Sequence, residues 1–411
     1  MKYYLIAGEA SGDMHASLLM QGLLQRDPQA DFRFWGGEKM EAVYRETIAA
    51  GGAGDGGKVR DYRDTAVMGI VEVIAKAGRI RNNLAMCRAD ILAWCPDAVI
   101  LIDYPGFNMK IARFAHDAGF KVFYYIAPKV WASRERRVEQ LKRYIDKLFV
   151  IFPFEVDWFR QHGIEPVYEG NPLVDSIEAA LSAAPSREEF LRANGLEDKP
   201  LIALLPGSRM QEIKFLAPRF RELARDPRMS AFQFVIAGAP GLSEDIYEKY
   251  FGVESTSRVA TSKDPSDTSI RTEGVDKCDG IHVLYGQTYA LLKHSAAAAI
   301  ASGTASLEAA LIGTPQVVCY GMNPLSFKIA ISILKVPYVS LANLIANKLI
   351  FKELLQDKCT PDAITEELLR LSGDADYRAG MLADYAAVRQ AFGTPGAASR
   401  IASVMYKSVQ N

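Results

Sequence analysis

A Ser-Gly-Thr turn between an apolar run and a helix-forming run is the stretch of this chain best suited to hold an anion. The apolar run, Ala296 to Ala301, is short enough for a strand that is buried on both faces. The run Ala305 to Leu311 is rich in strong helix formers. Ser302, Gly303 and Thr304 would then present free backbone N–H groups at the carboxyl end of a parallel strand, where open α/β sheets bind anions.

An acidic residue follows this turn on the predicted helix. Glu308 lies four residues after Thr304, so both side chains fall on one helical face. A carboxylate at this place could accept hydrogen bonds from the hydroxyl groups of a sugar. The alternative is that Glu308 only complements the positive end of the helix dipole, and this stretch by itself leaves both interpretations open.

A second strand–turn–helix site is predicted at Pro206-Gly-Ser-Arg209, after the predicted strand Leu201 to Leu205. Ser208 and Gln211 have the spacing of a capping box, for which we expect a structural role. Arg209 is predicted at the first helical position, where the helix dipole disfavours a cation unless an anion binds. We therefore expect Arg209 to bind a diphosphate, the alternative being a solvated surface arginine.

The first half of the chain carries carboxylates in corresponding places. Asp103 follows the predicted strand Ala98 to Ile102, at the kind of position where catalytic groups of α/β enzymes concentrate. It could act as a general base on an acceptor hydroxyl, or it could be a strand-end cap or half of an ion pair. Glu9 follows the predicted strand Lys2 to Ala7 and is expected at the same sheet edge. Ser11 and Asp13 are typical N-cap residues, and capping is the simplest role for both.

Predicted strands and helices alternate through both halves of the chain with short connections. This order is typical of a parallel, doubly wound α/β sheet, and it restarts at Leu201 after a link at Ala183-Ala-Pro185. A chain of 411 residues with 49% hydrophobic residues can form two complete cores. We therefore expect two Rossmann-like domains facing a cleft, the first over residues 1–182 and the second, with a helical tail, over residues 183–411.

Three other stretches have a weaker pattern. The segment Ala49 to Gly57 is rich in glycine and is expected to be a mobile loop. Most of the polar segment 252–280 is expected to be a surface excursion. The segment Phe351 to Gln356 is expected to be helical.

Two such domains, each with polar groups at its strand ends, predict a ligand bound between them. This architecture fits both glycosyltransferases with two Rossmann domains and nucleotide-sugar epimerases. A nicotinamide-dependent dehydrogenase needs Gly-x-Gly-x-x-Gly after a strand, and no predicted strand is followed by that spacing.

Composition disfavours several other classes. The net charge of −1 does not favour nucleic acid as a partner. The five cysteines contain no Cys-x-x-Cys pair, so neither a disulfide framework nor a zinc site is expected. The single Asp-x-Asp of the sequence, Asp374-Ala-Asp376, falls in the helical tail, and we predict no catalytic metal and no cofactor. The N-terminal run leads directly into Glu9 and Asp13, which indicates a strand and not a signal peptide, and no apolar run is long enough to span a membrane.

One apolar segment covers more than one face of a predicted helix and is followed by basic residues. A buried helix is the usual explanation, and a contact with a membrane surface or an acyl chain is the alternative. The apolar residues are Val67, Met68, Ile70, Val71, Val73 and Ile74.

Seven short stretches, each weak alone, form a specific set in this order across nearly the whole chain. They are Gly8-Glu-Ala-Ser-Gly-Asp13, Ala66-Val-Met-Gly-Ile-Val-Glu-Val73, Ile102-Asp-Tyr-Pro-Gly-Phe-Asn108, Pro128-Lys-Val-Trp-Ala132, Leu205-Pro-Gly-Ser-Arg209, Ser302-Gly-Thr-Ala-Ser-Leu-Glu308 and Tyr338-Val-Ser-Leu-Ala-Asn343. Together they resemble the lipid-A-disaccharide synthase family.

The resemblance implies an inverting glycosyltransferase of the GT-B type that needs no metal. Its donor would be UDP-2,3-diacylglucosamine, its acceptor 2,3-diacylglucosamine 1-phosphate, and its product a β-1,6-linked disaccharide formed with release of UDP. Members act as peripheral proteins on the cytoplasmic face of the inner membrane and exchange C-terminal segments in a homodimer. A UDP-sugar epimerase on a similar scaffold is the rival enzyme, and a nucleotide-sugar binding module is the non-enzymatic alternative.

The resemblance also implies roles for single residues. Glu9, Ser11 and Asp103 would serve the acceptor and catalytic side. The UDP side would be served by Arg209, Glu308 and Asn343. The family's hydrophobic patch falls on residues 67–74, which favours the membrane interpretation of that segment. The chain departs from the family pattern at Gly106, where a second aspartate is frequent, and at Asn171, where a histidine is frequent.

Overall fold

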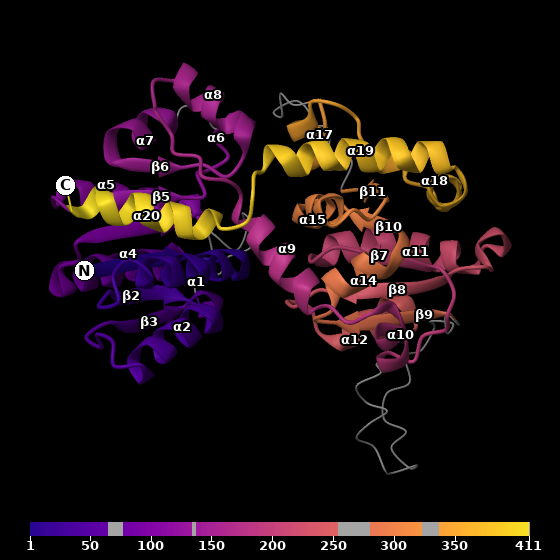
Figure 1. Cartoon of the computed structure of the whole chain (residues 1–411), viewed down its shortest axis with the longest axis horizontal. Coiled ribbons are helices and arrows are strands. Elements are labelled where there is room, and N and C mark those ends of the chain that lie inside the picture. The colour runs from indigo at the N-terminus through magenta and orange to yellow at the C-terminus, as the bar shows by residue number, and fades with distance from the viewer. Residues whose placement is uncertain (65–76, 134–136, 254–279, 323–336, 411) are drawn as a thin grey trace, which may run out of the picture. The chain divides into compact units, whose positions relative to one another are not determined.

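Two parallel sheets, each with six strands in the described part of the chain, carry the fold. The computed structural model describes residues 1–64, 77–133, 137–253, 280–322 and 337–410. The chain forms two units, one made of Met1–Asp175 with Phe392–Asn411 and the other of Ser176–Ala391 (Figure 1). Each unit is a doubly wound α/β sheet, as the alternating sequence pattern predicts.

The sheet of the first unit has the strand order β3-β2-β1-β4-β5-β6. Its strands are β1 (Lys2–Ala7), β2 (Asp31–Gly36), β3 (Gly57–Asp61), β4 (Ala98–Ile102), β5 (Lys121–Tyr125) and β6 (Lys147–Phe149). Ala7 of β1 pairs with Ile102 of β4, so these two strands end at the same level of the sheet. The residues that follow them, Gly8 and Asp103, therefore begin adjacent loops.

Successive side chains along each strand point to opposite faces of this sheet, and both faces are buried. In β1, Tyr3 and Leu5 belong to one core and Tyr4 and Ile6 to the other. Helices α1 (Ala10–Leu24) and α2 (Glu38–Ala49) contribute to the first of these cores. The helices on the second face include α4 (Ala77–Trp94), α5 (Pro105–Asp117), α7 (Val138–Tyr144) and α8 (Pro153–Gln161), while α6 (Val130–Ser133) precedes α7 and α9 (Pro172–Ala183) leads to the second unit.

The sheet of the second unit has the order β12-β11-β10-β7-β8-β9. Its strands are β7 (Leu201–Leu205), β8 (Gln233–Gly238), β9 (Ile281–Tyr285), β10 (Ser295–Ala301), β11 (Gln316–Tyr320) and β12 (Glu353–Leu355). Its helices are α10 (Arg187–Ala193), α11 (Met210–Arg225), α12 (Glu244–Phe251), α14 (Thr288–His294), α15 (Thr304–Ile312), α17 (Leu341–Ala346), α18 (Pro361–Gly373) and α19 (Ala375–Ala391). Pairing of Leu205 with Ile300 brings the ends of β7 and β10 together.

The strands at the centre of both sheets were predicted well, and so was the edge strand β9, whereas the edge strands β3 and β12 were not predicted. The strands β1, β4 and β7 have the predicted bounds. Helix α2 was not predicted, and β3 begins at Gly57, where only a loop was expected. The helix predicted over Phe351 to Gln356 is wrong, because Glu353–Leu355 pairs in parallel with β11, and this pairing overrides local helix propensity. Residues 254–279 of the predicted excursion lie outside the described part of the chain.

The last helix, α20 (Ala397–Gln410), belongs to the first unit, although the sequence led us to expect the whole tail in the second domain. It packs along α1, the first helix after β1 (Figure 1). Ile401, Ala402 and Met405 are completely buried in the core shared with α1. This apolar stripe needs a partner, and the surface of α1 supplies it. The tail prediction was therefore wrong for residues 392–411, and the first unit ends at Asp175, inside α9 and not at residue 182.

Close approach of α20 to α1 depends on the absence of a side chain at Gly22. A Cβ atom at this position would lie 2.9 Å from the Cβ of Ala402 and 3.1 Å from the Cα of Ser399. The Gly22→Leu variant is expected to lower the free energy of unfolding of the first unit by about 1–3 kcal/mol, measured by urea denaturation. Gly380→Leu in α19 is the control, because a Cβ at Gly380 would meet no described atom within 4 Å, and this change should stabilise by about 0.5–1 kcal/mol. Equal effects of the two substitutions would contradict this packing.

Candidate functional site

Glu9 and Asp103 lie at the carboxyl edge of the first sheet, as predicted. Glu9 is exposed and stands in extended conformation directly before α1. The loops that carry the two acids are in contact, because a Cβ atom at Gly8 would lie only 2.2 Å from the Cγ atom of Tyr104. Ser11 is exposed in the first turn of α1. The structure thus brings the three residues expected on the acceptor side to one edge of one unit.

The backbone at Asp103 has an unusual conformation that its neighbours hold in place. Asp103 and Tyr104 have φ angles of 44° and 50°, in the left-handed region that non-glycine residues rarely adopt. The carbonyl oxygen of Asp103 accepts hydrogen bonds from the Tyr124 hydroxyl at 2.7 Å and from Asn108 Nδ2 at 2.8 Å. Strained backbone of this kind persists where surroundings enforce it, and it concentrates at functional sites.

The carboxyl group of Asp103 is electrostatically suited to accept a proton. Burial raises its pKa above the usual value for aspartate, the Lys129 ammonium opposes this effect, and the Glu9 carboxylate adds to it. Among the ion pairs of the described residues none involves Asp103, so the alternative of a simple salt bridge is not supported. A carboxylate with a raised pKa is a better general base near neutral pH than an ordinary surface aspartate.

Three residues beside this edge were not singled out from the sequence as site residues. Glu155, on α8, is 1% exposed, and its carboxylate accepts hydrogen bonds from Trp131 Nε1 at 3.0 Å and from the N–H groups of Ile151 and Phe152. Lys129 affects the pKa of both Asp103 and Glu155. The motif Pro128 to Ala132 was the available signal for Lys129 and Trp131, whereas Glu155 reads in sequence only as an acid in the first turn of a helix.

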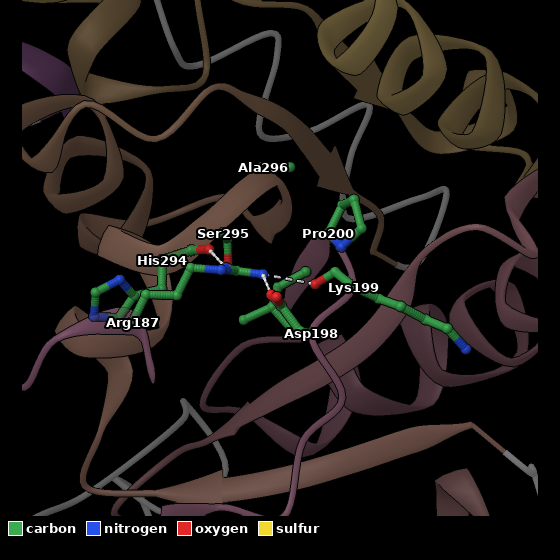
Figure 2. Close-up of a pocket in the computed structure, with 8 residues that line it drawn as sticks. Arg187, Asp198, Lys199, Pro200, His294, Ser295 and Ala296 are labelled. Atoms are coloured by element: carbon green, nitrogen blue, oxygen red, sulfur yellow. Dashed lines mark hydrogen bonds and ion pairs between the residues drawn. The ribbon is translucent and has the colours of Figure 1, made fainter. Parts of the chain in front are cut away.

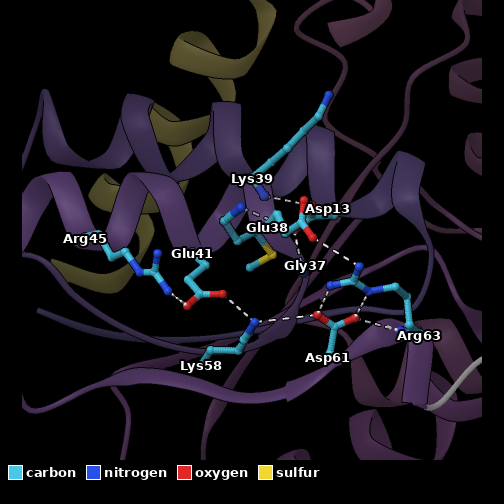
Figure 3. Close-up of polar contacts among 10 residues, drawn as sticks. Asp13, Gly37, Glu38, Lys39, Glu41, Arg45, Lys58, Asp61 and Arg63 are labelled. Atoms are coloured by element: carbon cyan, nitrogen blue, oxygen red, sulfur yellow. Dashed lines mark hydrogen bonds and ion pairs between the residues drawn. The ribbon is translucent and has the colours of Figure 1, made fainter. Parts of the chain in front are cut away.

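The predicted capping roles of Ser11 and Asp13 are wrong, because α1 already begins at Ala10. The Asp13 carboxylate instead accepts hydrogen bonds from the N–H groups of Gly37, Lys39 and Met40, at the start of α2 (Figure 3). It therefore caps a different helix from the one that carries it. Asp13 is a structural residue that fixes α1, and with it the Glu9 turn, against α2.

The Ser302-Gly303-Thr304 turn has the form that the sequence predicts. Helix α15 begins at Thr304, Gly303 and Thr304 are exposed, and no side chain caps the first turn. The Glu308 carboxylate accepts a hydrogen bond from the Tyr289 hydroxyl at 3.1 Å, and burial raises its pKa. Glu308 is thus held by the neighbouring helix α14, which fits a carboxylate fixed for a ligand better than one that serves only the helix dipole.

The local structure at Arg209 differs from the prediction. Arg209 is the residue before α11, not its first residue, and its side chain is 75% exposed. The carboxylate of Glu212 accepts hydrogen bonds from the N–H groups of Ser208 and Arg209. The capping residue is therefore Glu212 and not the predicted pair Ser208 and Gln211, and these amides are already satisfied. The Arg209 guanidinium, 3.6 Å from Glu212, is the group left to meet an anion.

Asn343 is buried within the second unit, which contradicts its predicted contact with UDP. Its Nδ2 donates to the Phe351 carbonyl at 3.1 Å and to Glu353 at 2.8 Å. Its Oδ1 accepts from the N–H groups of Ile350 at 2.9 Å and Phe351 at 3.3 Å. All four hydrogen-bonding positions of the amide are in use, and the residue is fully buried. Asn343 therefore fixes the segment that leads into β12.

The two departures from the family pattern have simple structural settings. Gly106 is exposed in the first turn of α5, and a Cβ atom there would meet no described atom within 4 Å. Asn171 is buried, donating to the Ile151 carbonyl and accepting from the Leu173 N–H, both at 2.9 Å. Asn171 therefore has a structural role, and Asp103 has no second carboxylate at position 106.

Two other features bear on the predicted sites. The apolar segment of Val67, Met68, Ile70, Val71, Val73 and Ile74 lies outside the described residues. In the described residues, no helix has both the length and the apolar character needed to cross a membrane. A pocket of about 400 Å³ lies at the amino ends of β7 and β10, at the opposite edge from the Ser302 turn. Figure 2 shows the residues that line it. Its Arg187 already donates to the carbonyl oxygens of His294 and Lys199.

Two Rossmann-like units with polar residues at the carboxyl edges of parallel sheets define the GT-B class of fold. Solved structures agree. The UDP-GlcNAc 2-epimerase from Neisseria meningitidis bound to UDP-GlcNAc matches with a TM-score of 0.64 at 13% identity, over 99% of this chain and 100% of that one. The calicheamicin glycosyltransferase CalG4 matches with a TM-score of 0.56 at 14% identity, over 100% and 98%. At such identities the likeness shows the fold alone.

Sequence comparison is more specific. The family model described as lipid-A-disaccharide synthetase matches residues 3–391. Lipid-A-disaccharide synthase of Trichlorobacter lovleyi is 33% identical over 409 residues, covering 99% of this chain and 97% of the relative. That of Myxococcus xanthus is 36% identical over 403 residues, covering 97% and 95%. The chain belongs to the lipid-A-disaccharide synthetase family, which confirms the resemblance drawn from its motifs. It is a glycosyltransferase of lipid A biosynthesis.

The different environments of Asn343 and Glu308 predict different effects of substitution. Asn343→Ala leaves several buried groups without partners, and we expect it to lower the free energy of unfolding by about 2–4 kcal/mol in urea denaturation. Its dissociation constant for UDP, measured by calorimetry on the folded variant, should not change. Weaker UDP binding in a normally stable Asn343→Ala variant would restore the original prediction.

Glu308→Gln should leave stability nearly unchanged and weaken UDP binding by about 10-fold, because a charged acceptor is lost.

Proposed function

We propose that this chain transfers the sugar of UDP-2,3-diacylglucosamine to the 6-hydroxyl of 2,3-diacylglucosamine 1-phosphate, forming a β-1,6 bond and releasing UDP. Membership in the family supports the overall reaction. The observation that carries the site is Asp103. It is a partly buried carboxyl group with a raised pKa, and it stands in a left-handed turn at the end of a buried strand.

In the proposed mechanism Asp103 is the general base. Its carboxylate accepts the proton of the acceptor's 6-hydroxyl as the oxygen attacks the anomeric carbon of the donor. Attack occurs from the face opposite UDP through an oxocarbenium-like transition state, so one displacement converts an α-linked donor into a β-linked product. The negative charge of Glu9 would strengthen Asp103 as a proton acceptor, and Ser11, in the first turn of α1, would contact the acceptor.

The second unit would supply the donor side of the reaction. The backbone N–H groups at Ser302, Gly303 and Thr304 and the Arg209 guanidinium would stabilise the charge that develops on the leaving diphosphate. Glu308 would accept hydrogen bonds from the ribose hydroxyls, with Tyr289 fixing the orientation of its carboxylate. In the proposed mechanism, neither a cofactor nor a metal ion takes part.

The lipid substrates suggest where the protein works. We propose that residues 67–74 contact the membrane surface and that the protein is peripheral on the cytoplasmic face of the inner membrane. We also propose a homodimer that exchanges C-terminal segments. In such a dimer the surface of α1 would receive the α20 helix of the partner through the same contacts that it makes within one chain.

Incubation of the purified protein with labelled UDP-2,3-diacylglucosamine and the acceptor phosphate tests the reaction. We expect a disaccharide 1-phosphate and UDP in equal amounts, identified by mass spectrometry, with a β linkage by NMR. An epimerase would change the configuration of the donor sugar without the acceptor, and a binding module would retain UDP without turnover. Either result would overturn the proposed function.

The Asp103→Asn variant tests the general base, since asparagine keeps the shape and cannot accept the proton. We expect kcat to fall by at least ~10²-fold with little change in KM. Because the base must be ionised and its pKa is raised, the wild-type rate should fall with decreasing pH at a higher pH than an ordinary aspartate would give, and the variant should lose this dependence.

Asp117→Asn on α5 is the matched control, because Asp117 is 56% exposed and pairs with Arg113 on the same helix. It should keep wild-type activity. Near-normal turnover by Asp103→Asn would exclude Asp103 as the base.

A further inference from the structure

The buried carboxylate of Glu155 has no part in the mechanism described so far. It is 1% exposed, yet it is held by donors from two separate segments of the first unit. One oxygen accepts the indole N–H of Trp131 at 3.0 Å, and the other accepts the N–H groups of Ile151 and Phe152 at 3.2 Å and 3.0 Å. A buried charge with these three partners joins the start of α8 to the segment before α7.

The segment that Glu155 holds also reaches the Asp103 site. Val130 begins α6 and is buried, whereas the neighbouring Lys129 is exposed. The Lys129 ammonium lies within electrostatic range of both Asp103 and Glu155, since it opposes the burial effect on the pKa of each. Trp131 packs edge-on against Phe154, with ring centroids 4.9 Å apart, and this contact helps to orient its ring.

We propose that Glu155 is a positioning residue, which through the Trp131 indole fixes residues 128–131 so that Lys129 stands beside Asp103. This inference rests on the proposed function of Asp103. The latch, meaning the contacts of Glu155 with Trp131, Ile151 and Phe152, is complete only when Glu155 is ionised. A protonated carboxyl group has fewer acceptor positions and would place its own hydrogen against one of three N–H donors.

The surroundings of Glu155 bring the pKa of its carboxyl group close to neutral pH. Burial raises its pKa to about 7, while the hydrogen bonds from Trp131, Phe152 and Ile151 and the charge of Lys129 lower it. Among the described residues, Tyr168 also interacts electrostatically with Glu155, whose charge contributes to the raised pKa of the tyrosine. Below the pKa the latch weakens and above it the latch is formed. The acidic limb of the rate profile would then contain a contribution from Glu155 in addition to that of Asp103.

Glu155→Gln is the informative substitution, because glutamine has the same shape but must turn an NH₂ group toward one set of donors. In protein labelled with ¹⁵N-tryptophan, the indole signal of Trp131, assigned by its loss in Trp131→Phe, should titrate with a midpoint near pH 7 in the wild type. It should not titrate in Glu155→Gln. This measurement uses no substrate, so it tests the latch even if the proposed reaction or the role of Asp103 fails.

Turnover tests the consequence for the site. Glu155→Gln and Trp131→Phe should each lower kcat by ~10- to 100-fold, as expected for a misplaced group near the reacting atoms. The double variant should be no worse than the poorer single variant, because both changes break one latch. Lys129→Met should reproduce most of this loss. Glu165→Gln, at an exposed ion pair with Arg160, and Trp158→Phe, on α8 itself, are the matched controls and should keep wild-type kcat.

Three results would overturn the proposal. The first is a Trp131 signal that does not change between about pH 5.5 and 8.5, or that titrates equally in Glu155→Gln. The second is wild-type kcat in folded Glu155→Gln. The third is a multiplication of the two single effects in the double variant, which would mean that Glu155 and Trp131 act separately.

Discussion

The parallel pairing of β1 with β4 is the constraint on which the first site depends. Ala7 lies opposite Ile102, so both strands end together, and Glu9 and Asp103 follow within two residues. A shift of one residue would separate the acids along the edge and would turn Tyr4 and Ile6 to the wrong face of the sheet. Because the two faces bury different side chains, the register is fixed by core packing. The position of this candidate site is therefore a product of hydrophobic burial and needs no dedicated contact.

The acidic residues discussed above fall into two groups, which differ in the hydrogen-bond donors that their carboxylates accept. Asp13, Glu212 and Glu353 accept hydrogen bonds from backbone N–H groups at or near the starts of helices, and so complete the local structure. Asp103 and Glu308 have raised pKa values caused mainly by burial, and the proposed function uses their carboxyl groups. We therefore expect a catalytic or ligand-binding role for a carboxylate that is buried but does not accept several hydrogen bonds from backbone N–H groups.

This division explains what could be predicted from the sequence. The ends of buried strands are visible as the points where apolar runs stop, so Glu9, Asp103 and the Ser302 turn could be located. The hydrogen-bond partner of a side chain cannot be seen in the sequence, because the partner belongs to another segment of the chain. Asp13 caps α2 and not its own helix, Asn343 is enclosed by residues 350–353, and Glu155 meets Trp131. The edge strands β3 and β12 were missed for the same reason, since pairing and not local propensity defines them.

The place of α20 has a consequence for synthesis of the protein. Helix α20, which completes the core of the first unit, leaves the ribosome long after α1, against which it packs. Until α20 has been synthesised, the apolar surface around Leu19 and Leu23 is either exposed to solvent or covered by a chaperone. A nascent chain that stops early keeps this surface exposed, even if its second unit has folded completely.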